Sequence, residues 1–194
     1  MNDLSFKSTI RPISRSSFNK MVSNYGEKKC ACPPWTIKES VYADKAYTRN
    51  VYDCTVCGIT DGIKVLMLHI CPTMPENNNF EEIRAFIKRN IDLGNKKLKA
   101  FLFGSKNIKA LGAQSSINFK KFEKMLANMN IPYSKIKGGP CINDVAYSSQ
   151  TDEWLISFGM LEGTYIKNDF NSPEEFIRRY YDEVELNEFD KFSW

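Results

Sequence analysis

Hydrophobic residues fall in short runs along much of this chain, and two neighbouring runs predict a β-hairpin. The segments CTVCGI (54–59) and IKVLMLHI (63–70) are joined through Thr60-Asp61-Gly62. Apolar runs of this length on either side of Asp-Gly are typical of two antiparallel strands connected by a tight turn. Both faces of the hairpin carry apolar side chains, so we expect other parts of the protein to cover both faces.

Three other segments have the capping residues or the apolar spacing of helices. Asn79 followed by Glu82, and Ser172 followed by Pro173, are typical helix starts. The expected helices lie near 80–93, near 118–130 and after residue 172. Apolar residues recur at helical spacing on one face of the second segment: Phe119, Phe122, Met125, Leu126 and Met129.

Apolar segments outside these helices predict further strands. The first of these strands begins at about Val41, and the others lie in 97–104, 131–139, 142–149 and 153–158. Strands mixed with helices in this order predict an α/β fold, which we expect to be a sandwich of antiparallel-rich β-sheets. The helices near 80–93 and 118–130 should lie on the outside of the sandwich.

The chain of 194 residues, 42% of them hydrophobic, has room for one compact domain with appendages. We expect a leader or loosely attached arm at 1–40, the main domain at 41–170, and an acidic C-terminal helix and tail at 171–194. Residues 1–29 carry a net charge of +4 and residues 172–194 a net charge of −4. Residues 1–29 have few periodic apolar positions, so we expect them to contribute little to the core.

Composition excludes several classes of function. No apolar run approaches the ~20 residues of a membrane span, and MNDLSFKSTI lacks the apolar core of a secretory signal. The net charge of +4 is too small to indicate a nucleic-acid-binding protein. Phosphate-loop, dinucleotide-binding and paired-histidine metal motifs are missing from the sequence. We therefore expect a soluble monomer with no cofactor, no bound metal, no nucleic-acid partner and no membrane span.

The cysteines leave two alternatives open. A chain of this size needs no disulfides, so reduced thiols are expected at all six cysteines, which are Cys30, Cys32, Cys54, Cys57, Cys71 and Cys141. The first alternative is a zinc site formed by the first four. It has the weaker support, because structural zinc sites favour two C-x-x-C turns and Cys54 and Cys57 would point to opposite faces of a strand. The second alternative is a catalytic cysteine paired with His69, the only histidine.

The predicted hairpin brings one cysteine to that histidine. If Asp61-Gly62 forms a two-residue loop, Thr60 faces Ile63, and counting back along both strands places Cys54 opposite His69. Their Cβ atoms would then be ~5 Å apart on one face. An imidazole in that position can take the thiol proton and leave a nucleophilic thiolate.

From about Tyr47 to Phe158 the order of elements resembles the CheD family of chemoreceptor glutamine deamidases. It resembles, more distantly, the deamidase domain of cytotoxic necrotizing factors. The similarity begins with Thr48, six residues before Cys54, and continues with the hairpin and with His69 in its second strand. FLFG (101–104) is similar to the Phe-Gly-Gly segment of the family. GAQSSINFKKFEKMLANMNIPYSKIKGG is similar to its long helix followed by Gly-Ile-Pro and Gly-Gly, and INDVAYSSQTDEWLI to its closing hairpin.

The resemblance implies a CheD-like fold and hydrolysis of a glutamine side-chain amide in a protein substrate. Cys54 would be the nucleophile, His69 the general acid and base, and Thr48 the residue that orients the imidazole. The substrate would be a chemoreceptor in the bacterial cytoplasm, or a host protein if the chain is an effector exported by a specialised system. The sequence departs from the family at Tyr52-Asp53, where the family has Gly-Ser. The alternative function is therefore a non-catalytic protein-interaction module on the same scaffold, in which cysteines could bind zinc.

Overall fold

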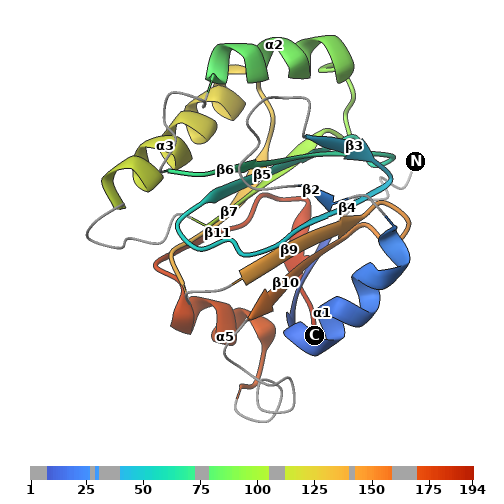
Figure 1. The fold of residues 1–194 in the computed structure, drawn as a ribbon, viewed down its shortest axis with the longest axis vertical. Coiled ribbons are helices and arrows are strands. Elements are labelled where there is room, and N and C mark those ends of the chain that lie inside the picture. The colour runs from blue at the N-terminus through green and yellow to red at the C-terminus, as the bar shows by residue number, and fades with distance from the viewer. Residues whose placement is uncertain are drawn as a thin grey trace.

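The described part of the chain has a mixed α/β fold with two mixed β-sheets and four α-helices (Figure 1). The computed structural model describes residues 8–26, 29–30, 40–72, 79–104, 112–139, 143–158 and 170–194. In that part of the chain no helix is long and apolar enough to cross a membrane.

The first sheet combines segments from both ends of the chain with the closing hairpin. Its strand order is β12-β1-β10-β9-β4-β2. β1 runs parallel to β10 and β12, β2 runs parallel to β4, and β9 is antiparallel to β10 and β4. The bounds of its strands are β1 (Ser8–Ser14), β2 (Lys29–Cys30), β4 (Lys45–Thr48), β9 (Asn143–Ser148), β10 (Glu153–Phe158) and β12 (Asp190–Phe192).

The second sheet contains the predicted hairpin at its centre. Its strand order is β11-β8-β7-β5-β6-β3, with β7 and β8 parallel and the other neighbours antiparallel. The bounds of its strands are β3 (Val41–Ala43), β5 (Thr55–Thr60), β6 (Val65–Ile70), β7 (Lys99–Gly104), β8 (Tyr133–Lys137) and β11 (Glu183–Glu185).

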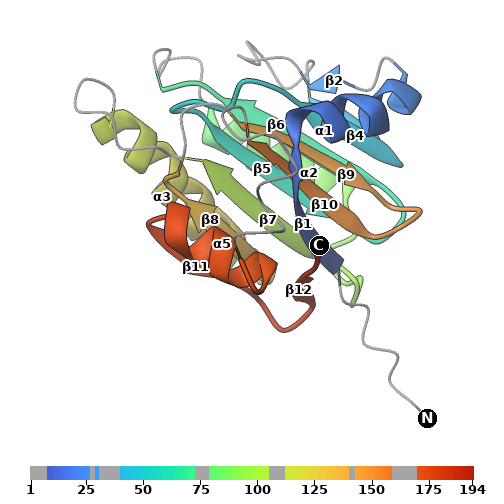
Figure 2. The same cartoon turned by 90° about the horizontal axis from the view of Figure 1, so that it is seen from below.

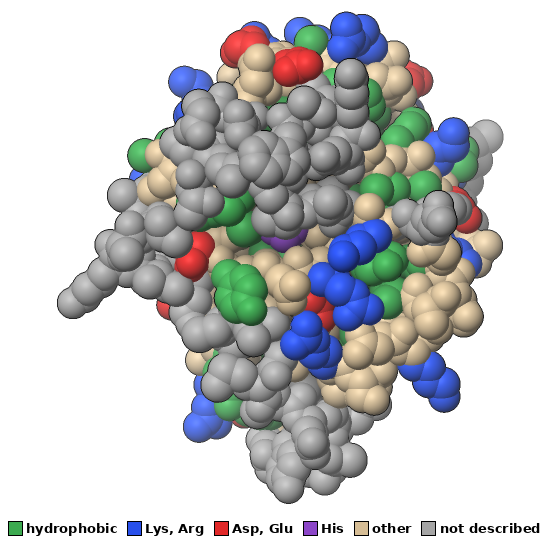
Figure 3. Space-filling view, viewed as in Figure 1, with side chains coloured by type: hydrophobic (Ala, Val, Ile, Leu, Met, Phe, Trp, Pro, Cys, Tyr) green, Lys and Arg blue, Asp and Glu red, His purple; other side chains and the backbone are tan. Residues whose placement is uncertain are grey.

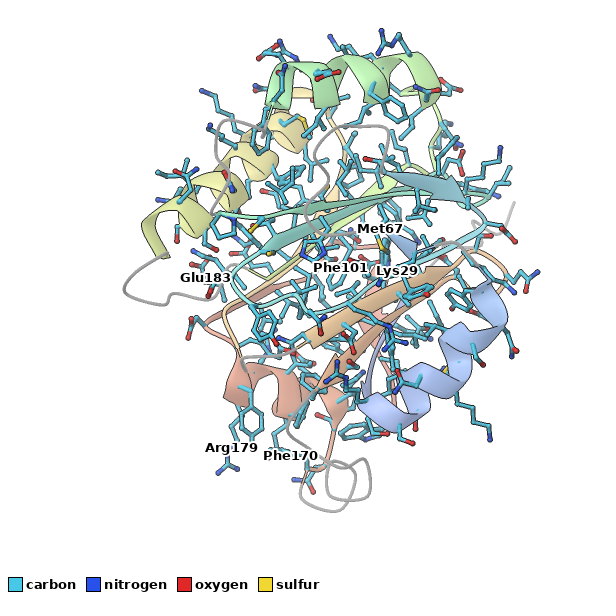
Figure 4. The ribbon with its side chains drawn as sticks, in the orientation of Figure 1. Lys29, Met67, Phe101, Phe170, Arg179 and Glu183 are labelled. Atoms are coloured by element: carbon cyan, nitrogen blue, oxygen red, sulfur yellow. The ribbon has the colours of Figure 1, made fainter. Side chains whose placement is uncertain are left out.

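The two sheets pack face to face, and three of the four described helices cover their outer faces. Met67 of β6 and Phe101 of β7 lie in the core between the sheets, together with Trp154 of β10 (Figure 4). The outer face of the second sheet packs against α2 (Phe80–Asn90) and α3 (Gly112–Asn128), and the outer face of the first sheet against α1 (Arg15–Val22). Every residue of β5 and β6 is buried, so the prediction that both faces of the hairpin are covered is confirmed.

α1 and α5 (Pro173–Tyr180) lie at the bottom of Figure 1, opposite α2 and α3, and are nearest the viewer in Figure 2. Ser172 caps α5 and Pro173 stands in its first turn, and Asn79 accepts a hydrogen bond from the backbone N–H of Glu82 at the start of α2. These predicted helix starts are confirmed. α2 ends earlier than expected because the backbone of Ile91 is extended, which buries its side chain.

The expectation that residues 1–29 contribute little to the core is wrong for the residues that the structure describes. β1 is an interior strand of the first sheet, and the side chains of Ile10 and Phe18 are 0% exposed. α1 and the 3₁₀ turn that follows it, η1 (Ser23–Tyr25), cover the outer face of that sheet. Alternating buried positions over only seven residues gave a weak strand signal, which the surrounding serines and charges obscured.

A buried polar cluster joins the two sheets at the end where β1 and β7 begin. The ammonium group of Lys99 lies 2.9 Å from Asp152 Oδ2 and 4.0 Å from Asp190 Oδ1. Ser8 and Tyr147 donate hydrogen bonds to Asp152, and Ser134 donates one to Asp190. Asp190 belongs to β12 and is buried, so this residue of the acidic C-terminal segment is built into the first sheet.

Candidate functional site

The hairpin register differs from the predicted one by two residues. Thr60 faces Val65, and Val56, not Cys54, is directly opposite His69. The loop contains four residues because the Asp61 carboxylate accepts hydrogen bonds from the backbone N–H groups of Ile63 (2.8 Å) and Lys64 (2.7 Å). A side-chain acceptor of this kind stabilises a turn wider than the two-residue Asp-Gly loop.

A shift of two residues keeps every side chain on its original face of the strand. Cys54 and Val56 both lie in the core between the sheets, and His69 faces Val56. Cys54 and His69 are therefore diagonal neighbours on the same inner face, not a directly facing pair. Diagonal positions remain within reach of an imidazole ring.

The structure brings Thr48 to His69. Thr48 is the last residue of β4 in the first sheet, and His69 lies near the end of β6 in the second. Thr48 Oγ1 is 2.6 Å from His69 Nδ1, and both residues are 0% exposed. This contact joins the two sheets and fixes one nitrogen of the ring.

The other ring nitrogen, Nε2 of His69, is also buried. It has no hydrogen-bond partner among the residues that the structure describes. Buried polar atoms are nearly always hydrogen-bonded, so an unpaired imidazole nitrogen is a feature that calls for an explanation. If the Nδ1–H group donates a hydrogen bond to Thr48 Oγ1, Nε2 carries the lone pair and can accept a proton.

The loop that carries Cys54 is held from the first sheet by two residues of β9. The buried carboxylate of Asp144 accepts a hydrogen bond from the backbone N–H of Asn50 (3.0 Å), and the Asn143 carbonyl accepts one from Val51 (2.8 Å). Arg15, the first residue of α1, lies 3.5 Å from the same carboxylate. α1 therefore supports the loop as well as the sheet.

The second sheet and α3 hold the loop from the other side. Ser115 of α3 donates a 2.5 Å hydrogen bond to the carbonyl of Asp53, the residue before Cys54. Gly104 ends β7 with φ of 110°, and a Cβ atom there would lie 2.2 Å from the Cys54 carbonyl oxygen. Only glycine permits this close approach, so Gly104 fixes the backbone at Cys54.

Sequence reasoning did not identify the residues that hold this loop: Ser115, Asn143, Asp144 and Arg15. They come from three distant segments, α1, α3 and β9, and no local pattern connects them. For Gly104, the glycine at the end of an apolar strand was a usable signal. Helix α3 begins at Gly112, earlier than the expected start near 118. Its first turns lack an apolar pattern, because Ser115 is buried there by a hydrogen bond and not by apolar contact.

The zinc alternative gains no support from the described cysteines. Cys57 lies in the core under α2 and α3, on the opposite face of β5 from Cys54, and burial raises the pKa of its thiol. Across the described ranges, no three His, Cys, Asp or Glu side chains are grouped as metal ligands. Cys32, Cys141 and the side chain of Cys30 lie outside the described residues.

The surface over this site carries positive charge and an exposed aromatic ring. In Figure 3 only a small part of the buried histidine, in purple, is visible near the middle of the face, with Lys and Arg side chains beside it. Arg15 hydrogen-bonds to Asn50 of the Cys54 loop, and the Arg49 guanidinium lies 5.6 Å from the ring centres of Phe18 and Tyr47. Tyr52, two residues before Cys54, is 44% exposed.

No protein-family model matches the chain, and a search of curated proteins finds no match either. What the site can do therefore rests on its own geometry. A histidine with one nitrogen fixed and the other unpaired among the described residues, on the same inner face as a cysteine, is suited to acyl transfer by a thiolate.

Proposed function

We propose that this protein is a cysteine-dependent protein glutamine deamidase, with Cys54 as nucleophile, His69 as general acid and base, and Thr48 as the positioning residue. The observation that carries the proposal is the 2.6 Å contact between Thr48 Oγ1 and His69 Nδ1, with Nε2 buried and unpaired among the described residues. The placement of Cys54 on the same inner face supports it further, as does the resemblance of the order of elements to that of CheD-like deamidases.

The reaction follows ordinary acyl-transfer chemistry. His69 Nε2 takes the proton of the Cys54 thiol, and the thiolate attacks the amide carbon of a glutamine side chain. The protonated imidazole returns its proton to the departing nitrogen, and ammonia leaves a thioester. His69 then takes a proton from water, the hydroxide attacks the thioester, and glutamate is released. The backbone N–H of Cys54 is the proposed donor to the oxyanion.

Thr48 has a distinct part in this scheme. Its hydroxyl oxygen accepts a hydrogen bond from the Nδ1–H group, which fixes the tautomer that leaves Nε2 basic. It also stabilises the imidazolium that forms when Nε2 takes the thiol proton. Since Thr48 lies in the first sheet and His69 in the second, the packing of the two sheets sets the orientation of the ring.

The substrate is a protein with an accessible glutamine, either a chemoreceptor or, for an exported effector, a host protein. Arg15 and Arg49 favour a substrate segment with acidic residues near the target glutamine. Tyr52, two residues before Cys54 in the same loop, is an exposed ring that such a segment would contact.

Hydrolysis in ¹⁸O-labelled water tests the activity. A chemoreceptor cytoplasmic fragment and a eukaryotic cell lysate are each incubated with wild type, Cys54→Ser or His69→Ala, and peptides are searched for glutamine converted to labelled glutamate. That conversion adds about 3 Da, which separates new hydrolysis from earlier deamidation. We expect labelled sites with wild type and with the control Cys57→Ser, and none with Cys54→Ser or His69→Ala.

The double variant Cys54→Ser/His69→Ala should be hardly worse than either single variant, because members of a catalytic unit are strongly non-additive. Labelling that persists with Cys54→Ser would contradict the proposal. If no substrate is labelled and iodoacetamide modifies Cys54 no faster than the other thiols near neutral pH, the non-catalytic interaction module becomes the better interpretation.

A further inference from the structure

The observed register places a second cysteine opposite Cys54. Thr55 faces Ile70 in the last pair of the β5–β6 ladder. The next residue beyond each strand is a cysteine, Cys54 before Thr55 and Cys71 after Ile70, so the register extended by one pair places the two cysteines in facing positions just beyond the ladder. Cys54 belongs to the core between the sheets, and Cys71 packs against the same core.

Facing positions on antiparallel strands suit a disulfide. Cα atoms of such pairs lie about 4.5–5.5 Å apart. This separation falls within the range of about 4.4–6.8 Å that disulfides span. Both residues are thiols in this structure. Cys57, the other described cysteine, lies on the opposite face of β5 and faces Leu68, so it cannot join this pair.

We propose that Cys54 and Cys71 form a reversible disulfide, which makes them a redox-modification site within the hairpin. The oxidant is a small disulfide such as glutathione disulfide. Formation of the bond needs only these two thiols. Its consequence rests on the proposed function, because a disulfide at Cys54 removes the thiolate that would attack the substrate.

The thiol–disulfide exchange with glutathione disulfide proceeds in two steps. Cys71 is half-buried whereas Cys54 is 6% exposed, so the Cys71 thiolate attacks glutathione disulfide first and one glutathione thiolate leaves. The Cys54 thiolate then attacks the Cys71 sulfur of the mixed disulfide, and the second glutathione leaves. The two protons lost by the protein thiols end on the two glutathiones. Cys54 and Cys71 are oxidised together, and one glutathione disulfide is reduced.

The test uses the full chain in mixtures of reduced and oxidised glutathione. Under oxidising mixtures we expect the intact mass to fall by about 2 Da and a peptide linking Cys54 to Cys71 to appear in non-reducing digests. Iodoacetamide labelling of Cys54 should drop about tenfold or more and return after dithiothreitol. Cys57→Ser is the matched control and should form the same linked peptide.

Cys71→Ser should form no link, and its Cys54 should remain available to iodoacetamide or carry a glutathione adduct. Circular dichroism checks that this variant is folded, and Cys71→Ala serves in its place if it is not. The proposal is overturned if Cys54 of the folded protein stays a thiol in every mixture, or links to Cys30, Cys32 or Cys141. A linked pair in a protein without deamidase activity would leave this inference standing and remove the proposed function.

Discussion

The imidazole of His69 is the side chain on which the proposed chemistry of this molecule depends. It is the only histidine, it is fully buried, and its two ring nitrogens have different surroundings. Nδ1 is hydrogen-bonded to the hydroxyl of Thr48, while Nε2 has no hydrogen-bond partner in the described part of the chain. A purely structural histidine would be expected to satisfy both nitrogens.

Removal of the Thr48 hydroxyl should affect activity and stability together. Thr48→Val keeps the shape of the side chain but leaves Nδ1 without this partner, whereas Thr48→Ser keeps a hydroxyl. Because one neutral hydrogen bond contributes about 0.5–1.5 kcal/mol, we expect Thr48→Val to slow deamidation about two- to tenfold, far less than Cys54→Ser. Its free energy of unfolding should fall by about 1–3 kcal/mol, since a buried polar group loses its partner.

Turnover and urea unfolding of the two variants provide the measurement. Thr48→Ser should stay close to wild type in both. If Thr48→Val loses stability but keeps a wild-type rate and pH profile, Thr48 is structural and does not position the imidazole.

The Thr48–His69 contact was predictable only through a family resemblance, because these residues lie on different sheets and no local pattern relates them. The face shared by Cys54 and His69 was predictable from strand alternation. Their register was not, because the hydrogen bonds accepted by Asp61 widen the loop from two residues to four. A propensity for Asp-Gly turns does not report on this side-chain contact.

At the scale of elements, the sheets fit together at Gly58. This residue lies in β5, and the indole ring of Trp154 from β10 occupies the space that a side chain would need. A Cβ atom at Gly58 would lie 2.2 Å from Cη2 and 2.5 Å from Cζ3 of that ring. Both residues are buried, so neither sheet can move aside without loss of packing.

Gly58→Ala should therefore destabilise the protein by about 1–3 kcal/mol through overpacking. Trp154→Phe lacks the two ring atoms in question, so the double variant Gly58→Ala/Trp154→Phe should lose less than the sum of the single losses. Denaturant unfolding of the four proteins measures this coupling. Additive losses would show that the contact between these residues does not limit the approach of the sheets.

Elements with strong local signals were predicted well. β10 occupies the predicted 153–158, and α5 begins at its predicted cap. β1 was missed because its stability comes from pairing with β10 and β12, which follow it by most of the chain. The seven residues of β1 alone do not indicate which distant strands pair with it.

At the scale of the whole molecule, the cluster around Lys99 joins β1, β7 and β12. Burial acts to raise the pKa of Asp152, but hydrogen bonds from Ser8 and Lys99 and the charge of Lys99 lower it overall. Burial raises the pKa of Asp190, and the hydrogen bond from Ser134 and the charge of Lys99 only partly offset this. The pKa of Asp152 is therefore lowered and that of Asp190 is raised, so acid changes their contributions to stability in opposite directions.

The folded state favours ionised Asp152, so its contribution to stability is present above the ordinary carboxyl pKa and is lost as the pH falls through its lowered value. For Asp190 the contribution belongs to the protonated form and is lost as the pH rises through its raised value. We expect Asp152→Asn to lower the free energy of unfolding at neutral pH, with the loss shrinking below about pH 4.

Asp190→Asn should lower the free energy of unfolding less than Asp152→Asn at neutral pH, because the neutral amide resembles the protonated acid. Urea unfolding of wild type and both variants across acidic and neutral pH checks this ranking. A larger loss for Asp190→Asn than for Asp152→Asn at neutral pH would contradict it.

The position of β1 between β10 and β12 has a consequence for biosynthesis. Thr9 pairs with Glu153 and Lys191, so a chain emerging from the ribosome presents β1 long before either partner has been made. Until then Ile10, Phe18 and the inner face of the β5–β6 hairpin have nothing to bury them, and contacts this distant in sequence form slowly. The nascent chain is therefore a natural client for chaperones that bind exposed apolar segments, and it acquires its sandwich only after β10 and β12 have been synthesised.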